Sequence, residues 1–317
     1  MVGQLRTLPQ ALQNRPAADE TALRGEIGRL HDTDSDRVFL THGATEGDFL
    51  ALSFLGQRAR REHSRAPRIR ISTPEYPQLL DGALAVGYRR MARALPADVL
   101  ALSDPNNPEG CGRTRAEVGE IAAGCRRVVI DETFREFTGR PSHASPAEPG
   151  WWVVGSFTKI FGADAHRVGF VIPAAEDAGA FDRFHGVAAD GLAAASVTAA
   201  RAILGSRKVI LDEGRRIFRR NLSVLRRTVR GVGDREAPLW FDRDLPDLGG
   251  DRMAEGACRR GVLVCPGSFF GDPNGVRICL TKRCFPEDLS AYLTVREQLR
   301  ADRPRNRTRA PRRGPTH

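Results

Sequence analysis

Lysine, aromatic residues and long apolar runs are all scarce in this sequence of 317 residues. Only Lys159, Lys208 and Lys282 carry a side-chain amine, and aromatic residues make up 7% of the chain. No stretch approaches the roughly 20 uninterrupted apolar residues of a membrane helix, and residues 1–10 lack the apolar core of a signal peptide. The most apolar region, residues 186–204, is predicted to form one packed helix. We therefore expect a cytoplasmic protein without a membrane span.

Paired cysteines and clustered histidines are also missing. The six cysteines stand at positions 111, 125, 258, 265, 279 and 284 and form no C-x-x-C pair. Because zinc sites in proteins usually show such spacing, we expect no metal. Disulfides are rare in chains without a secretory signal, so the cysteines are predicted to be buried, small apolar side chains.

The formal net charge of +10 is concentrated at the carboxyl end of the chain. Residues 299–317 contain seven arginines and one aspartate, a net charge of +6, which leaves +4 for the other residues. This tail has three prolines and almost no apolar residues, so it is predicted to be disordered. We expect any contact with nucleic acid to be weak, non-specific and confined to the tail.

Short apolar segments alternate with helical stretches after residue 36, which is typical of an α/β fold. Two segments, Val128–Ile130 and Phe170–Ile172, are apolar throughout, as expected when helices cover both faces of a mainly parallel sheet. This pattern predicts a large domain over residues 37–205. Its strand candidates are residues 68–73, 99–104, 127–131, 152–157 and 167–172, and its helix candidates include residues 46–61 and 114–125.

The pattern changes after residue 205. Apolar residues at 211, 218, 222, 225 and 229 recur with helical spacing, so residues 207–232 are predicted to form one long helix. Strand candidates at residues 262–265 and 276–280 follow it. They predict a small α+β domain over residues 206–298, before the disordered tail of residues 299–317. Residues 1–36 are interpreted as a short segment that joins the small domain or a dimer interface.

Five polar segments lie at the ends of predicted strands or the starts of helices, where ligands bind in open α/β sheets. Thr41–Glu46 precedes an apolar helix whose amino end would favour a phosphate, although an ordinary helix cap has the same pattern. Ser103–Gly110 combines two X-Pro bonds with a glycine, which predicts a tight turn and is compatible with a cis proline. Asp131 ends a buried strand. Ser156–Lys159 places the rare amine among hydroxyl side chains, and Arg277 is flanked by apolar strand residues.

In order and approximate spacing, these segments resemble the class I/II aminotransferases, which are fold-type I enzymes that depend on pyridoxal 5′-phosphate. The resemblance extends from about residue 15 to residue 280. Its most specific parts are the Asn-Pro segment at 104–108 and Ser156–Lys159 with the Gly162 and Arg167 that follow. Within this family the chain resembles the histidinol-phosphate aminotransferase-like and threonine-phosphate decarboxylase-like branch. The resemblance implies a three-layer large domain with a mostly parallel sheet, a small α+β domain, and a homodimer.

The resemblance also implies a role for each matching residue. Lys159 would bind the cofactor as a Schiff base and move a proton at the substrate Cα, Asp131 would pair with the pyridinium nitrogen, and Tyr76 would stack on the ring. Asn107 would bind the phenolic oxygen and the substrate, while Arg277 would hold the substrate α-carboxylate in a bidentate fork. The cofactor phosphate would be bound by the group Ala44, Thr45, Ser156 and Arg167.

Two positions depart from the pattern of the family. Phe134 stands where most members have a tyrosine that donates to the phenolic oxygen, and in this it resembles the threonine-phosphate decarboxylases. Arg15 replaces a tyrosine that usually reaches the cofactor phosphate of the neighbouring subunit, and an arginine would still be able to contact that phosphate.

The expected function is therefore amino transfer between an L-amino acid and a 2-oxo acid. The segment at residues 261–271 is more similar to general amino-acid transaminases than to the histidinol-phosphate or threonine-phosphate enzymes. Phe134 leaves open a decarboxylase that depends on the same cofactor, and release of carbon dioxide would distinguish it. A third interpretation, a binding module with a basic tail, has no chemical need for both Lys159 and Asp131.

Overall fold

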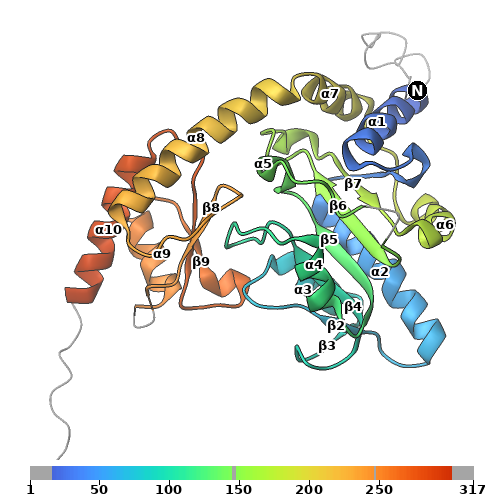
Figure 1. Cartoon of the computed structure of the whole chain (residues 1–317), viewed down its shortest axis with the longest axis horizontal. Helices are drawn as coiled ribbons and strands as arrows, with labels where there is room; N and C mark the ends of the chain where they lie inside the picture. Colours follow the sequence, from blue (N-terminus) through green and yellow to red (C-terminus); the bar gives the residue numbers. More distant parts are fainter. Residues whose placement is uncertain (1–15, 145–147, 246–247, 302–317) are drawn as a thin grey trace, which may run out of the picture.

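The computed structural model describes residues 16–144, 148–245 and 248–301, and in these residues it contains two sheets joined by a long helix (Figure 1). Arg15, and the part of the predicted tail from residue 302 onward, lie outside the described residues. No helix within the described ranges is long and apolar enough to cross a membrane.

The large sheet contains seven strands in the order β1-β7-β6-β5-β4-β2-β3. The strands from β3 to β6 in this order are parallel, whereas β7 runs antiparallel to both β6 and β1. The prediction of a mostly parallel sheet is therefore confirmed. The strands are β1 (Phe39–Thr41), β2 (Arg68–Arg70), β3 (Arg89–Arg90), β4 (Ala97–Ser103), β5 (Cys125–Asp131), β6 (Trp151–Ser156) and β7 (Gly169–Ile172).

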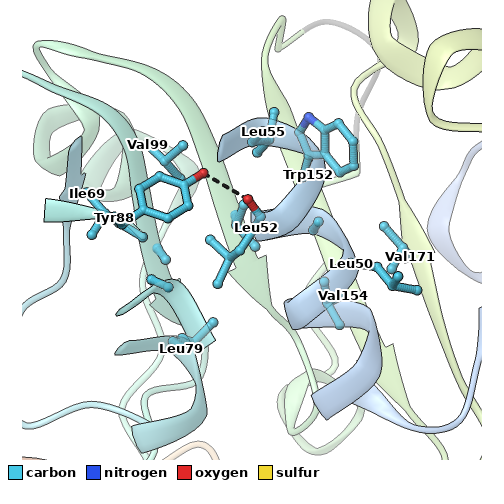
Figure 2. Packing of buried hydrophobic residues seen from close by; sticks show 14 of the residues in the cluster. Leu50, Leu52, Leu55, Ile69, Leu79, Tyr88, Val99, Trp152, Val154 and Val171 are labelled. Atoms are coloured by element: carbon cyan, nitrogen blue, oxygen red, sulfur yellow. Dashed lines mark hydrogen bonds between the residues drawn. The ribbon is translucent and has the colours of Figure 1, made fainter. Parts of the chain in front are cut away.

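Helix α2 (Ala44–His63) packs against the middle of this sheet and carries the main core (Figure 2). Leu50, Leu52 and Leu55 are at most 3% exposed and pack with Trp152 and other apolar strand residues, which removes their apolar surface from water. The hydroxyl of Tyr88, also buried in this cluster, donates to the Leu52 carbonyl at 3.0 Å. The packing fixes the start of α2 beside the carboxyl ends of the central strands.

The other helices around the large sheet are shorter. Helix α4 begins at a capping box, in which Thr114 and Glu117 satisfy each other's backbone N–H groups. Helix α1 contributes Leu23 and Ile27 to a second core cluster with strands β6 and β7, and it packs on α7. These helices are α1 (Pro16–His31), α3 (Pro77–Ala85), α4 (Arg115–Ala122), α5 (Arg135–Thr138), α6 (Ala178–Ala188) and α7 (Ala194–Gly205).

The long helix α8 (Arg207–Thr228) leads from the large sheet to the second sheet (Figure 1). Phe218, Leu222 and Leu225 on one face of α8 pack into a separate core with the second sheet and its helices. The second sheet has the order β8-β10-β9 and is antiparallel. Its strands and helices are β8 (Leu239–Asp242), α9 (Gly250–Cys258), β9 (Cys265–Pro266), β10 (Val276–Cys279) and α10 (Phe285–Ala301).

Several boundaries differ from those predicted. The apolar region 186–204 is not one helix, because α6 ends at Ala188 and α7 begins at Ala194, with Asp190 and Gly191, poor helix formers, between them. The strand predicted at 262–265 is reduced to Cys265–Pro266, since the Val262 N–H donates to the Ala257 carbonyl and holds the chain on α9. The long helix ends four residues early, at Thr228.

The two ends of the described chain bear on two further predictions. The segment at 16–36 packs on the large sheet and not on the second one, and its alternative place at a dimer interface stays a prediction. Residues 299–301, predicted as part of a disordered tail, continue α10, and Arg300 donates to the Asp244 carboxylate at 2.7 Å. The cysteines are free thiols, but none is buried as predicted: all six are half-buried or exposed.

Candidate active site

A cavity of about 720 Å³, called here the central cavity, lies where the carboxyl ends of the large sheet's strands face α8 and the second sheet. Strands β4, β5 and β6 are parallel neighbours, so the residues that follow them meet at one edge of the sheet. Eight of the nine predicted site residues line the cavity, although they come from segments far apart in the sequence. They are Ala44, Thr45, Tyr76, Asn107, Asp131, Lys159, Arg167 and Arg277.

The amino end of α2 and the Arg167 guanidinium form a positively charged rim. Gly43 has φ of 88°, a conformation that favours glycine, and a Cβ atom there would lie 2.6 Å from the Arg167 Nη2. Glycine therefore allows the guanidinium to approach the backbone directly before Ala44 and Thr45. Helix N–H groups and an arginine at the same place are suited to bind a phosphate.

Asp131 lies on the floor of the central cavity and is 5% exposed. Its Oδ1 accepts a hydrogen bond from the Thr133 backbone N–H at 2.8 Å, which fixes the orientation of the carboxyl group. Burial raises the pKa of Asp131, and the hydrogen bonds from Thr133 oppose the increase. A cation beside this carboxyl would favour its ionised form.

Two further carboxyl groups are buried near Asp131. Asp48, one turn after Ala44 on α2, is 1% exposed, and neither of its oxygens has a hydrogen-bond partner among the described residues. Burial, and secondly the charges of Asp131 and Glu75, raise the pKa of Asp48 well above its usual range. The raised pKa values keep the Asp48 and Glu75 carboxyl groups protonated near neutral pH, which leaves Asp131 as the carboxyl group that lines the floor of the cavity.

Asn107 and Arg277 join the large sheet to the second sheet. The Arg277 Nη1 donates to the Asn107 Oδ1 at 3.0 Å, and the Arg277 guanidinium lies over the Phe270 ring, 5.0 Å from its centroid. The Asn107 backbone N–H in turn donates to the Ser103 hydroxyl oxygen at 2.9 Å. The Asp104–Pro105 peptide in this turn is cis, which the sequence had suggested. These contacts leave the amide nitrogen of Asn107 and the rest of the guanidinium for a ligand.

Lys159 follows β6 and is the only lysine that lines the cavity among the described residues. Its side chain is 56% exposed, and its Nζ lies 3.5 Å from the Asp164 Oδ1, whose side chain is also exposed. Exposed ion pairs contribute little free energy. The amine is therefore free to leave Asp164 for a reaction partner in the cavity.

Tyr76 and Ser156 are placed differently from each other. The Tyr76 hydroxyl is 3.2 Å from the Thr45 Oγ1 at the cavity wall, whereas Ser156 is buried behind Thr158, with 2.7 Å between the two hydroxyl oxygens. The structure therefore places Thr158, not Ser156, at the central cavity. The sequence offered the signal for this, since Thr158 is also a hydroxyl residue and stands next to Lys159.

The sequence analysis also missed Glu75, which supports the Asn107 turn. Its Oε1 accepts hydrogen bonds from the Ser103 hydroxyl and from the Tyr76 N–H, and its Oε2 lies 3.3 Å from the Asn106 amide nitrogen. Burial raises the pKa of Glu75 to about 8, despite the opposing hydrogen bonds from Ser103 and Tyr76. Nothing in the local pattern of Thr73–Tyr76 showed that this acid would be buried.

This pKa predicts a pH-dependent loss of stability. The folded protein retains the Glu75 proton that the unfolded chain releases near its ordinary pKa of 4.5, so stability is lost as pH rises from there to about 8. Wild type should lose up to about 5 kcal/mol of unfolding free energy from this group, and Glu75→Gln should not. Urea unfolding at pH 5 and pH 8 measures the difference. Glu120→Gln, at an exposed position on α4, is the control, and an equal pH dependence of Glu75→Gln and wild type would refute the assignment.

Comparison with known proteins agrees with this geometry. The family model described as aminotransferase class I and II matches residues 83–284. The histidinol-phosphate aminotransferase of Natronomonas pharaonis is 26% identical over 298 residues, which cover 86% of this chain and 80% of the relative. That of Thermosynechococcus vestitus is 34% identical over 123 residues, 38% of this chain and 33% of the relative.

Solved structures show the same fold. A pyridoxal-phosphate-dependent aminotransferase from Streptococcus suis superposes with a TM-score of 0.76 at 18% identity, covering 96% of this chain and 87% of that one. The L-threonine-O-3-phosphate decarboxylase from Porphyromonas gingivalis gives a TM-score of 0.70, also at 18% identity, with 93% of each chain covered. At such identities the likeness concerns the fold alone, and the reaction follows from the family match. The chain belongs to the aminotransferase class I and II family and is a pyridoxal-phosphate-dependent aminotransferase.

Proposed function

We propose that the reactants are an L-amino acid and a 2-oxo acid, and that the residues of the central cavity perform the transfer. The observation that carries this proposal is that one cavity combines an amine, a buried carboxyl group and two guanidinium groups from four separate segments. A module that only binds would not need the amine and the carboxyl group together. The residues proposed to act are Lys159, Asp131, Asn107, Tyr76, Arg167 and Arg277, with Ala44, Thr45 and Thr158 at the phosphate end.

The residues present fit the cofactor. The Gly43 backbone leaves room for Arg167 beside the amino end of α2, which suits the phosphate. The buried Asp131 carboxyl group, with its Oδ1 fixed by Thr133, suits a protonated ring nitrogen. When bound, pyridoxal phosphate supplies an electron sink and an aldehyde carbon that receives the amino group.

Each side chain then has a definite task toward the substrate. The Arg277 guanidinium, positioned by Asn107 and Phe270, holds the α-carboxylate and so orients the Cα–H bond. The Lys159 amine would leave Asp164, take the proton from the substrate Cα and return it at the cofactor carbon C4′, on the other side of the substrate nitrogen. Tyr76, held by Thr45, fixes the ring plane from the cavity wall.

The proposal is tested by adding amino acids to the protein loaded with cofactor. A substrate amino acid should abolish the visible absorbance of the cofactor, and a 2-oxo acid should restore it, with one 2-oxo acid released for each amino group transferred. Phe134 lines the cavity and is the observation that favours decarboxylation as the second candidate. Stoichiometric release of carbon dioxide without a 2-oxo acid would contradict the proposal and support that candidate.

We also propose that the protein is a homodimer, as the family resemblance implies, and that it is cytoplasmic, as expected from the sequence. Sedimentation equilibrium should give twice the chain mass of 34.8 kDa. A mass of one chain at micromolar concentration would contradict the dimer, and recovery of the native protein in the membrane fraction would contradict the location.

A further inference from the structure

A second cavity, called here the arginine cavity, has a volume of about 510 Å³ and lies where the chain leaves β2 and the edge strand β3. Figure 1 shows these two strands at one end of the large sheet. The walls come from residues 70–73, residues 90–93, Leu100 on β4 and Ile121 on α4. Among the described residues, none lines both this cavity and the central cavity, so the proposed amino transfer gives the arginine cavity no task.

Arg70, the last residue of β2, is 8% exposed and forms the buried side of the arginine cavity. Its guanidinium donates to three backbone carbonyls, from Nη1 to Arg93 at 3.0 Å and from Nη2 to Ile121 and Ala123 at 2.5 and 2.9 Å. These neutral acceptors fix the orientation of the guanidinium but leave a net positive charge. Because a charge withdrawn from water is costly unless it is paired, the buried guanidinium favours an anion in the cavity beside it.

Two more arginines line the same cavity. The Arg90 Nη2 donates to the Ile71 carbonyl at 3.1 Å, and Arg93 follows three residues later. Both side chains are exposed. Charged side chains commonly protect edge strands from aggregation, but that role does not require them to share a cavity with a buried third cation. Three guanidinium groups around one cavity, with no acid among the described residues that line it, create a positive potential that attracts anions.

The number and kind of donors indicate a phosphate group. A carboxylate is matched by one bidentate guanidinium, whereas a phosphate presents more oxygens and can bind several guanidinium groups at once. Ser72 and Thr73, which also line the cavity, add two hydroxyl groups. Met91, Leu100 and Ile121 contribute apolar walls, and the volume is in the range of small-molecule sites, so there is room for more than the phosphate.

We infer that the arginine cavity binds a soluble small molecule that carries a phosphate group on an apolar or aromatic body. Arg90 and Arg93 bind the phosphate from the open side, Arg70 attracts it from the buried side, and the body lies against Met91 and Leu100. The inference is independent of the proposed amino transfer, because it uses none of the residues assigned to that reaction.

The test is isothermal titration of phenyl phosphate into the cofactor-loaded protein, in which the cofactor already fills the phosphate position of the central cavity. We expect one molecule to bind per chain. Benzyl alcohol, which has an aromatic ring and no phosphate, should bind at least about tenfold more weakly, because it lacks the hydrogen bonds to charged groups. No binding of phenyl phosphate at millimolar concentration, or equal binding of the two compounds, would overturn the inference.

Variants at the edge strand locate the site. Arg90→Gln and Arg93→Gln should each weaken phenyl phosphate at least about tenfold. Arg89→Gln is the matched control, because Arg89 is the exposed neighbour on β3 and does not line the cavity; it should change the affinity less than about threefold. Arg70 is left unaltered, since it ties β2 to the end of α4. An equal loss in Arg89→Gln and Arg90→Gln, or unchanged affinity in both cavity variants, would overturn the inference.

Discussion

Replacement of Lys159 by alanine is expected to lower the rate of amino transfer by at least about 1,000-fold. The amine is proposed both to hold the cofactor covalently and to move the Cα proton, and no other lysine lines the cavity among the described residues. The loss should be measured as the single-turnover rate of the cofactor absorbance change. An unreacted amino acid should still bind, since Arg277 is unaltered.

The scarcity of lysine provides unusually clean controls for this experiment. Lys208 is 89% exposed and pairs with Asp212 one turn along α8, and Lys282 pairs with Asp288 at 2.8 Å. Alanine at either position should change the rate less than about twofold, because exposed ion pairs contribute little. A comparable loss in Lys208→Ala or Lys282→Ala, with Lys159→Ala remaining active, would exclude the proposed role.

Replacement of Asp131 by asparagine should lower the single-turnover rate on the order of 100- to 1,000-fold. Asparagine has the same shape and can keep accepting the Thr133 N–H bond through its oxygen, but it is neutral. It therefore no longer favours a proton on the ring nitrogen of the cofactor, which reduces the electron sink. The affinity for the cofactor should fall as well, because a charge-assisted hydrogen bond is replaced by a neutral one.

The matched control is Asp81→Asn, an exposed position on α3, where we expect no change in the rate. Thermal unfolding of the cofactor-free proteins separates catalysis from stability. Since burial raises the pKa of Asp131, Asp131→Asn should be at least as stable as wild type without cofactor. A rate within about threefold of wild type would contradict the pairing of Asp131 with the ring nitrogen.

The sequence predicted the edge of the sheet that carries the site. Asp131 ends a strand, and Asn107 and Lys159 follow strands, that were recognisable from their apolar residues. Parallel strands bring such residues together whatever their separation in the chain. Arg277 comes from the second sheet, and its place beside Asn107 followed only from the family resemblance. The sequence did not show whether Ser156 or Thr158 would face the cavity. The two hydroxyl residues are only two positions apart, and packing decides which of them lines the cavity.

Features that depend on tertiary contacts were not predictable. Glu75 and Asp48 are ordinary polar residues in the sequence, and their burial results from the packing of α2 and of the Asn107 turn against the sheet. Ile210 and Ile217 on α8 are seven residues apart, so a second apolar face was visible in the sequence. The prediction of the long helix, however, used only the face that packs into the core. The break at 189–193 and the two-residue strand β9 have local causes instead, because Asp190 and Gly191 are poor helix formers and the Val262 N–H donates to the Ala257 carbonyl.

The central claim is that Lys159 is the residue that binds the cofactor covalently, and borohydride reduction of the loaded protein tests it most directly. Reduction makes the bond between cofactor and amine permanent, and mass mapping of the digested peptides then locates it among three lysines. We predict the pyridoxyl mass on the peptide that contains Lys159 and on no other. The mass on the peptide of Lys208 or Lys282, or on no lysine at all, would contradict the account.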